Sequence, residues 1–343
     1  MAGKFRFTFG PWNIHEGEDV FGPSVRDSIS FDEKLALFKS LGFDGIQFHD
    51  DDAVTNLNDK SPSQIETESL ALKSRLNNLG LEPEFVAPRL WEDQMTIDGG
   101  YTSNDPLCRK YAIERSKKAI DIANHLGTDL LVLWLAREGT YIREAKDSKL
   151  ATERLVEAIN VMLEHDPNIR VCIEPKPNEP MDHAYIPTTG HAIALGMLTT
   201  DPSRVGVNIE SAHAILAGLD PSDEMGFALA HQKLWTVHLN DQNGLKFDQD
   251  KSFGSVDLRR AFNQVRILDK HDYGQQGEWV GLDVKAMRTQ ELPATLHLSN
   301  SLEVFKMLLE LSRSLDDSVL ETLVEQRDYE SLDLMIMKHL LGK

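Results

Sequence analysis

The chain has 343 residues, enough for one barrel-sized domain or two smaller ones, with 41% hydrophobic and 27% charged residues, as is ordinary for a globular protein. Its net charge of −19 would repel a phosphate backbone, so we do not expect nucleic-acid binding. No apolar run is long enough to cross a bilayer, and the only cysteines, Cys108 and Cys172, suit a reducing compartment, so we expect a cytoplasmic protein without membrane association.

Short apolar runs recur along the chain, and segments with helical spacing of apolar residues lie between them. Eight runs are predicted to be strands, at 5–10, 45–50, 82–88, 130–136, 170–175, 205–210, 234–240 and 278–284. Eight strands that alternate with helices predict an α/β fold, a (β/α)8 TIM barrel. A doubly wound sheet is the alternative, but no glycine-rich phosphate turn follows the first strand.

Two helical segments end the chain. The first, 301–315, is predicted to be the last barrel helix, and the second, 329–343, is apolar at helical spacing. We therefore expect a barrel over residues 1–315 and a short C-terminal helical tail over residues 316–343. The apolar side of this tail is expected to pack on the barrel or on a neighbouring subunit.

Residues with polar or aromatic side chains stand at or near the ends of six predicted strands: His49, Trp134, Glu174, Glu210, His238 and Asp283. In a barrel these strand ends meet on one face, which is where active sites are found. A single polar residue at a strand end is more often a helix cap than a catalytic group. Several in succession predict a shared site.

Four stretches, EPKPNEP, NIESAH, KFDQDKSFG and GLDVK, could bind a metal ion. Their candidate residues are Glu174 and Lys176, Glu210 and His213, Asp248 and Asp250, and Asp283. Hard divalent cations prefer oxygen ligands, and Mn and Co also accept imidazole. The five carboxylates carry a charge of −5, which two divalent ions would reduce to −1, so two ions are predicted. Each stretch alone is a weak signal, because a DxD loop is usually a solvated turn.

The sequence resembles xylose isomerase in FTFGPW, FHDDD, DGGYTSND, LAREG followed by AKD, EPKPNEP, AGL, KFDQD and a terminal HLLG, which together span nearly the whole chain. The resemblance implies a divergent sugar isomerase of the xylose isomerase-like TIM barrel superfamily. Such an enzyme interconverts an unphosphorylated aldose and ketose by a metal-assisted 1,2-hydride shift. The expected cofactors are two divalent ions per chain, Mn, Co or Mg.

The resemblance also implies a role for each matching residue. The first ion would be held by Glu174, Glu210 and Asp283, and the second by Glu210, His213, Asp248 and Asp250, the last of which would also support proton transfer. His49, supported by Asp52, would assist ring opening, and Lys176 would bind the oxygen at C1. Trp134 would form an apolar wall. Phe21 would reach a neighbouring subunit's site in a homodimer or homotetramer.

Three positions depart from the family pattern. His238 replaces an aspartate that binds the first ion, which favours Mn or Co over Mg and resembles the metal sets of rhamnose isomerases and keto-sugar epimerases. His15 stands near where a pocket tryptophan is expected and is predicted, like Trp91, to contact substrate. Arg89 stands near a sugar-contacting position, where it could bind substrate or form a surface ion pair. Two alternatives therefore stay open: a metal-dependent epimerase or lyase acting on a keto sugar or glycoside, and a non-catalytic sugar-binding barrel.

Overall fold

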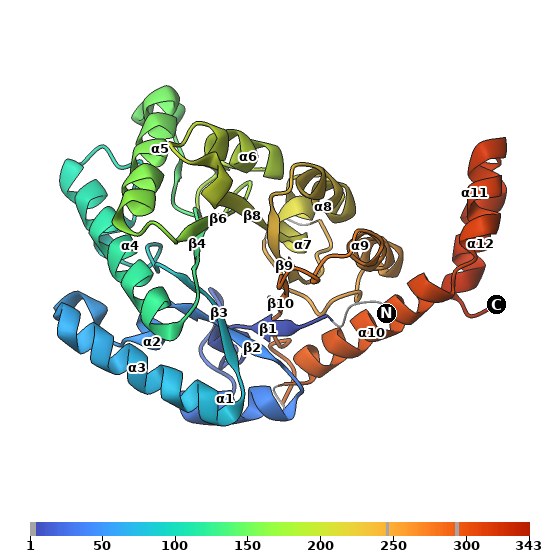
Figure 1. Ribbon diagram of the computed structural model, residues 1–343, viewed down its shortest axis with the longest axis horizontal. Helices are drawn as coiled ribbons and strands as arrows, with labels where there is room; N and C mark the ends of the chain where they lie inside the picture. The colour runs from blue at the N-terminus through green and yellow to red at the C-terminus, as the bar shows by residue number, and fades with distance from the viewer. Residues whose placement is uncertain (1–4, 245–246, 292–294) are drawn as a thin grey trace.

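The structure, a computed structural model, describes residues 5–244, 247–291 and 295–343 and contains a barrel of eight parallel strands inside a ring of helices (Figure 1). The strand order is β1-β10-β9-β8-β6-β4-β3-β2. The ends of this order meet where the backbone N–H of Asp44 donates to the carbonyl of Phe7 at 2.9 Å. The barrel strands are β1 (Phe7–Phe9), β2 (Gly45–His49), β3 (Glu82–Ala87), β4 (Leu130–Trp134), β6 (Arg170–Glu174), β8 (Val205–Glu210), β9 (Leu234–Leu239) and β10 (Trp279–Leu282).

All eight predicted strands are present, so the predicted (β/α)8 barrel is confirmed. The short antiparallel pair β5 (Gly139–Thr140) and β7 (His183–Ala184) was not predicted; two-residue strands carry no periodic signal. The main helices are α1 (Phe31–Ser40), α2 (Asp50–Ala53), α3 (Pro62–Leu79), α4 (Pro106–Leu126), α5 (Ser148–His165), α6 (Thr189–Met197), α7 (Ser211–Leu216), α8 (Pro221–Ala230), α9 (Leu258–Lys270), α10 (Leu296–Ser314), α11 (Asp317–Gln326) and α12 (Tyr329–Leu340).

The boundaries of the outer helices follow local capping chemistry, as α3 illustrates. The Ser61 side chain accepts the backbone N–H of Gln64, which satisfies a donor that the first turn leaves free. Pro62 takes the first helical position, where its missing N–H costs nothing. Gly80 ends the helix in the left-handed conformation, with φ 66°, which a residue without a Cβ adopts easily.

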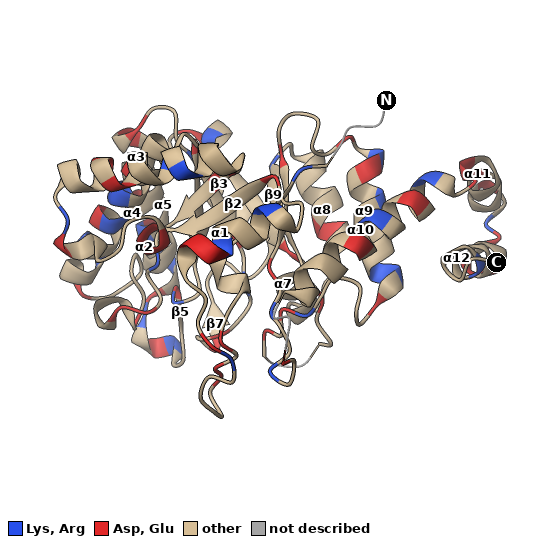
Figure 2. Ribbon diagram, turned by 90° about the horizontal axis from the view of Figure 1, so that it is seen from below, with Lys and Arg blue, Asp and Glu red and all other residues tan. Residues whose placement is uncertain are grey.

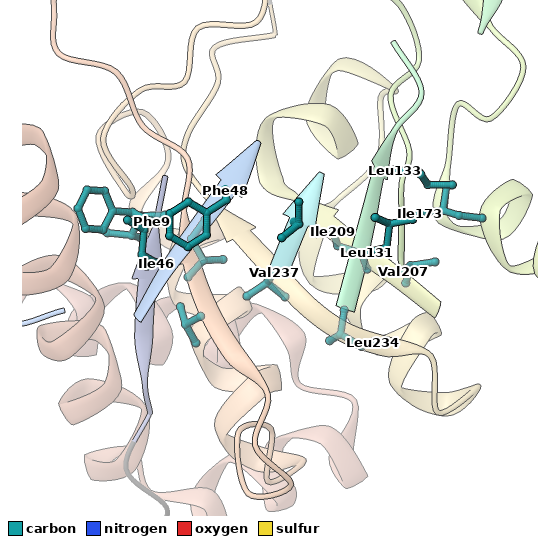
Figure 3. Close-up of a cluster of buried hydrophobic side chains, with 14 of the residues drawn as sticks. Phe9, Ile46, Phe48, Leu131, Leu133, Ile173, Val207, Ile209, Leu234 and Val237 are labelled. Carbon is teal, nitrogen blue, oxygen red and sulfur yellow. The ribbon is translucent and has the colours of Figure 1, made fainter. Parts of the chain in front are cut away.

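Buried apolar side chains fix the strands against the helices, and a close-up of this core is shown in Figure 3. Phe48 and Leu131 have no exposed surface, and Ile209 is 1% exposed. Full burial of a side chain of this size stabilises the fold by roughly 1.5–3 kcal/mol. Packing of this kind holds the carboxyl ends of the strands at fixed positions, which is what a site built from several strands requires.

The strand register brings predicted site residues side by side. Trp134 of β4 lies opposite Glu174 of β6, and Glu210 of β8 lies opposite His238 of β9. In Figure 2 the β5–β7 pair and long loops extend from one side of the barrel, and acidic and basic residues are interspersed on the helices. Among the described helices, none combines the length and apolarity that a membrane crossing needs.

The chain continues beyond α10 as two helices, α11 and α12, which lie at the end of α10 away from the barrel (Figure 1). Helix α12 is anchored to α10, because the His339 imidazole lies 2.7 Å from the carbonyl oxygen of Leu311. Ion pairs from Arg266 to Asp317 and from Arg259 to Asp333 connect the tail to α9. Helix α11 lies within the predicted helical tail 316–343, although the spacing predicts a helical segment there only over 329–343; it has no buried residue in the single chain. The expected packing against a neighbouring subunit stays a prediction.

Candidate active site

A cavity of about 490 Å³ opens at the carboxyl ends of the barrel strands. A larger cavity, about 1060 Å³, lies at the opposite ends of the strands and contains none of the predicted site residues. The smaller cavity is lined by every predicted metal ligand: Glu174, Glu210, His213, His238, Asp248, Asp250 and Asp283. The structure thus brings together residues that are more than 100 positions apart in the sequence.

Glu210 is the centre of this constellation. It belongs to three groups in which the possible ligand atoms lie within 4.8 Å of one another. The groups are Glu174, Glu210 and His213; Glu210, His238 and Asp283; and Glu210, Asp248 and Asp250. One carboxylate shared among three groups can contribute to two neighbouring ion sites.

The residues present fit a divalent ion. His213 Nδ1, His238 Nδ1 and Asp248 Oδ1 are buried and make no hydrogen bond with any of the described residues. Buried polar atoms without a partner are rare in folded proteins, and a bound ion is one explanation for them. Carboxylate oxygens combined with imidazole nitrogens form a donor set suited to Mn or Co. The chemistry of the set therefore agrees with the predicted metal centre.

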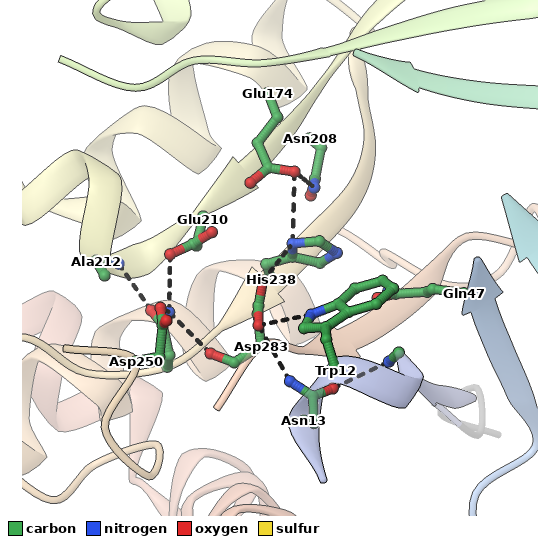
Figure 4. A network of polar contacts seen from close by, with 12 residues as sticks. Trp12, Asn13, Gln47, Glu174, Asn208, Glu210, Ala212, His238, Asp250 and Asp283 are labelled. Carbon is green, nitrogen blue, oxygen red and sulfur yellow. Dashed lines mark hydrogen bonds and ion pairs between the residues drawn. The ribbon is translucent and has the colours of Figure 1, made fainter. Parts of the chain in front are cut away.

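Figure 4 shows how several of the candidate ligands are held in place. The side chains of Trp12 and Asn13 both donate to Asp283 Oδ1 at 3.0 Å, and Asn208 donates to Glu174 Oε2 at 2.7 Å. Asn240 donates to Glu210 Oε1 at 2.9 Å and to Asp250 Oδ1 at 3.2 Å. Hydrogen bonds of this kind orient ligands around a metal.

These supporting residues were missed from the sequence. Asn208 and Asn240 both lie within predicted strands, at 205–210 and 234–240, and buried asparagines there could have been suspected. Nothing in the chain order shows which carboxylate each one serves, because partners such as Asn208 and Glu174, or Asn240 and Glu210, meet only in the fold.

The close approach of several acids in this cluster shifts the pKa values of its members. Burial, followed by the charges of Asp248, Asp250 and the other acids, raises the pKa of Glu210 well above its ordinary value. Burial and Asp248 likewise raise the pKa of Asp250. Burial alone would raise the pKa of Glu174 and lower that of His238, because it favours the neutral form of each. The attraction between the two charged groups outweighs this effect of burial. The pKa of Glu174 falls to about 2 and that of His238 rises to about 9.

We expect metal binding to release protons and to tighten as the pH rises. His238, with its pKa of about 9, is protonated at neutral pH and must lose that proton to become a ligand. Each proton displaced should tighten the apparent affinity by roughly tenfold per pH unit below that pKa. Calorimetric titration with Mn²⁺ in buffers of different ionisation enthalpy measures this release. An affinity that stays flat from about pH 6 to 8.5 would exclude His238 as a ligand.

Lys176 lies deep in the cavity, where its side chain is 4% exposed. Its ammonium group is 2.9 Å from Asp248 Oδ2 and 4.8 Å from the centre of a Trp134 ring. Burial lowers the pKa of Lys176, but the charges of Asp248 and Glu210 outweigh it and raise the pKa above its ordinary value, so Lys176 is a cation. Glu179 accepts the backbone N–H of Asp248 at 3.0 Å, which ties the EPKPNEP segment to the loop that carries the aspartates.

Lys285, which the sequence analysis did not assign, makes a similar ion pair with Asp250 and also lines the cavity. Its position at the end of the GLDVK stretch gave no sign of this contact. The two aspartates of the DQD loop therefore each have a lysine partner.

Aromatic rings form part of the wall of the same cavity. His49 stacks on Trp12 with ring centres 4.2 Å apart and meets the edge of Trp91 at 4.9 Å. Trp91 in turn meets Trp134 at 4.6 Å. His49, Trp91 and Trp134 thus lie where a substrate would contact them, whereas Asp52 stands behind His49, 3.2 Å from its Nδ1.

Two predicted substrate contacts lie outside this cavity. His15 does not line it; Trp12 does, because the turn Pro11–Asn13 places that indole over His49. His15 Nδ1 instead accepts the backbone N–H of Gly17 at 3.0 Å, and burial lowers the pKa of His15 to about 4. Phe21 is 86% exposed and is not among the described residues that line this cavity.

Other motif residues are structural. Asp50 of FHDDD is fully buried, and both of its oxygens accept from Arg115 at 2.8 Å. Glu138 of LAREG accepts the backbone N–H groups of Gly100 and Thr102 at 2.8 Å, so it holds the DGGYTSND loop. These contacts fix the loops around the cavity without reaching into it.

Solved structures that are similar in fold include several sugar epimerases. A 3-keto-D-glucoside 4-epimerase from E. coli is similar with a TM-score of 0.63 and 13% identity, over 89% of this chain and 100% of that one. A D-tagatose 3-epimerase-like protein gives a TM-score of 0.62 and 17% identity over 90% and 98%. D-Psicose 3-epimerase from Clostridium cellulolyticum H10, solved with D-tagatose, gives 0.58 and 15% over 90% and 96%. Identities this low show a common fold, and not a common reaction.

A comparison of the sequence with models of protein families identifies the family of the chain. Residues 35–304 match the family described as xylose isomerase-like TIM barrel. This match confirms the predicted resemblance at the level of the superfamily, whereas membership of the xylose isomerases themselves stays a prediction. The chain belongs to the xylose isomerase-like TIM barrel family.

Proposed function

We propose that the protein is a divalent-metal-dependent enzyme that moves hydrogen at a carbon next to the carbonyl group of an unphosphorylated sugar. The observation that carries this proposal is the convergence of acids and histidines on Glu210, in a cavity walled by tryptophans. Sugar epimerases and aldose–ketose isomerases both perform this chemistry. The names of the similar structures add support for the epimerase class.

The chain supplies most of what such a reaction needs. A bound divalent ion would polarise the sugar oxygens and lower the pKa of hydroxyl groups that it binds. Glu174, Glu210, His238 and Asp283 would hold the first ion, and Glu210, His213, Asp248 and Asp250 the second. Lys176 would stabilise negative charge on the carbonyl oxygen, and Trp91 and Trp134 would exclude water from the sugar.

The first candidate is an epimerase acting on a keto sugar or glycoside. Glu174 and Asp283 each place an oxygen near His238 Nδ1, at 3.5 and 3.7 Å, and come from different strands, β6 and the end of β10. Two carboxylates from different strands in one site could divide the work, one removing a proton from carbon and the other returning a proton. One ion suffices for this reaction.

The second candidate is the aldose–ketose isomerase predicted from the sequence. It is favoured by the group of Glu210, Asp248 and Asp250, which a one-ion epimerase does not require. With His213 Nε2 3.0 Å from Asp248 Oδ2, this group could hold a second ion. Two ions and a water-poor aromatic wall suit a hydride shift between adjacent carbons.

Turnover in D₂O separates the candidates. Keto sugars and aldoses would be screened with Mn, Co and Mg, and each product would be analysed for deuterium by NMR. Proton abstraction incorporates deuterium from solvent, whereas a hydride shift retains the substrate hydrogen. Ion analysis of the loaded protein gives an independent measure, one ion for the epimerase and two for the isomerase. Full activity in metal-free protein would contradict both.

We also expect a homodimer or homotetramer in which Phe21 contributes to a neighbour's cavity. Phe21 and Val20 are 86% and 85% exposed, and such apolar surface is normally buried in an assembly. Phe21→Ser should weaken association and raise KM, while Phe227→Ser, which changes an exposed phenylalanine on α8, should do neither. Sedimentation velocity and steady-state kinetics measure both effects. A fully active monomer would contradict the expectation.

A further inference from the structure

Arg89 contacts His49, the cavity histidine whose ring stacks on Trp12. Its Nη2 lies 2.6 Å from His49 Nδ1 and 3.2 Å from Asp52 Oδ1. The side chain is 21% exposed, and the same guanidinium group lies 2.9 Å from Asp51 and 3.4 Å from Glu92. Arg89 is therefore a well-anchored cation, in contact with His49 as well as with the acids that pair with it.

The chemistry of the Arg89–His49 contact determines which imidazole nitrogen carries the proton. A guanidinium group only donates hydrogen bonds, and it does not lose its charge in proteins. A proton on Nδ1 would set two N–H donors against each other at 2.6 Å. We propose that Arg89 is a positioning residue that fixes His49 as the tautomer with a bare Nδ1 and a proton on Nε2.

Asp52 alone would favour the opposite tautomer. Its carboxylate lies 3.2 Å from His49 Nδ1, and a carboxylate stabilises a proton on the nitrogen that faces it. In this structure, however, both of its oxygens have other donors. Oδ2 accepts the backbone N–H of His49 at 3.1 Å, and Oδ1 accepts from Arg89. Asp52 thus orients the Arg89 guanidinium group and the backbone of His49. Arg89, and not Asp52, is the hydrogen-bond partner of His49 Nδ1.

This tautomer gives His49 a defined task in the cavity. Nε2 is on the other side of the ring from the arginine and makes no hydrogen bond to a described residue, while the stacked Trp12 and the edge of Trp91 fix the ring plane. An Nε2–H group can donate to a sugar oxygen but cannot accept a proton from it. His49 is therefore a hydrogen-bond donor to the substrate, not its base, a conclusion about the substrate that rests on the proposed function.

The tautomer itself can be tested without substrate or metal. The protein would be labelled with ¹⁵N-histidine, and proton–nitrogen correlation spectra across two bonds would distinguish bare from protonated ring nitrogens. His49→Gln assigns the His49 signals among the 12 histidines of the chain. We expect native His49 to show a bare Nδ1 and a protonated Nε2.

Substitution of Arg89 then tests the cause. In Arg89→Met, Nδ1 should gain a proton and donate it to Asp52, which remains close by. The matched control is Arg137→Met, since Arg137 lines the same cavity but donates to the carbonyl of Trp91 at 3.0 Å and does not contact His49. This control should leave the His49 signals in the native pattern.

Two results would overturn the proposal: a protonated Nδ1 in the native protein, or an unchanged tautomer in folded Arg89→Met. The native spectrum decides the first question even if the variant does not fold. Because neither measurement uses turnover, failure to find an isomerase or epimerase activity would leave this result standing.

Discussion

Replacement of Glu210 by glutamine is expected to abolish divalent-metal binding and, with it, activity. Glu210 is the one residue common to all three groups of possible ligand atoms, so its loss affects both ion sites. Loss of an outer-shell partner already weakens metal affinity or activity by about 10–100-fold, and loss of a shared ligand should exceed that range. Titration with Mn²⁺, followed by electron paramagnetic resonance, measures the affinity directly.

The same variant should not be less stable than the native protein when both lack metal. The raised pKa of Glu210 means that its ionised form is disfavoured in the fold, so above its unfolded value of 4.5 this carboxylate destabilises the ion-free state. Glutamine removes the charge and keeps an oxygen for Asn240. Native protein should gain about 2.7 kcal/mol at a metal concentration near 100 times Kd, and the variant should gain nothing.

Glu92→Gln is the matched control for Glu210→Gln. Glu92 lines the same cavity, but its side chain is 62% exposed and pairs only with Arg89 at 3.4 Å. It belongs to none of the groups of ligand atoms found among the described residues. Its substitution should leave metal affinity unchanged. If Glu210→Gln bound Mn²⁺ as tightly as this control, the metal centre would have to be placed elsewhere.

Lys176→Met is expected to lower turnover by at least about 100-fold, the scale of losing one donor to a developing oxyanion. The lysine is a buried cation beside Trp134, placed to bind a substrate oxygen. Metal binding should survive, because Asp248 keeps His213 as a partner at 3.0 Å. It could even tighten, since the ammonium group competes with an ion for Asp248 Oδ2.

Lys285→Met provides the comparison for Lys176→Met. Lys285 also pairs with an aspartate of the DQD loop, but its side chain is 47% exposed, so water can replace much of its effect. Lys285→Met is therefore expected to lose less turnover than Lys176→Met. The measurements are KM, kcat and metal content for both variants. If Lys176→Met retained near-native kcat, Lys176 would be a structural partner of Asp248 and not a substrate ligand.

Much of the fold could be predicted from the sequence because the signals are local. Runs such as Val205–Glu210 are short, apolar and bounded by helix caps, and eight of them in alternation with helices leave few architectures other than a barrel. The metal ligands could be predicted for a related reason. Glu174 and Glu210 end β6 and β8, and Asp283 directly follows β10, whereas Asp248 and Asp250 stand in the loop after β9; strand ends and the loops that follow them share one face of a barrel.

The two short strands β5 and β7 and the bounds of helix α11 could not be predicted in the same way. Two residues are too few for any periodicity, and α11 has no fully buried residue in the single chain, although Leu320 packs against the core. Their structure depends on contacts with segments far along the chain or at the end of α10.

Within the site, the sequence by itself determined which residue types were available and near which strand ends they stand. Only the tertiary structure decided their partners: that Trp12 and not His15 covers His49, that Asn240 bridges Glu210 and Asp250, and that Arg89 contacts His49 Nδ1. The physical reason is that hydrogen bonds and ion pairs act over about 3 Å and depend on direction, so they are set by how loops pack across the barrel mouth. Periodicity along the chain carries no information about distances between those loops.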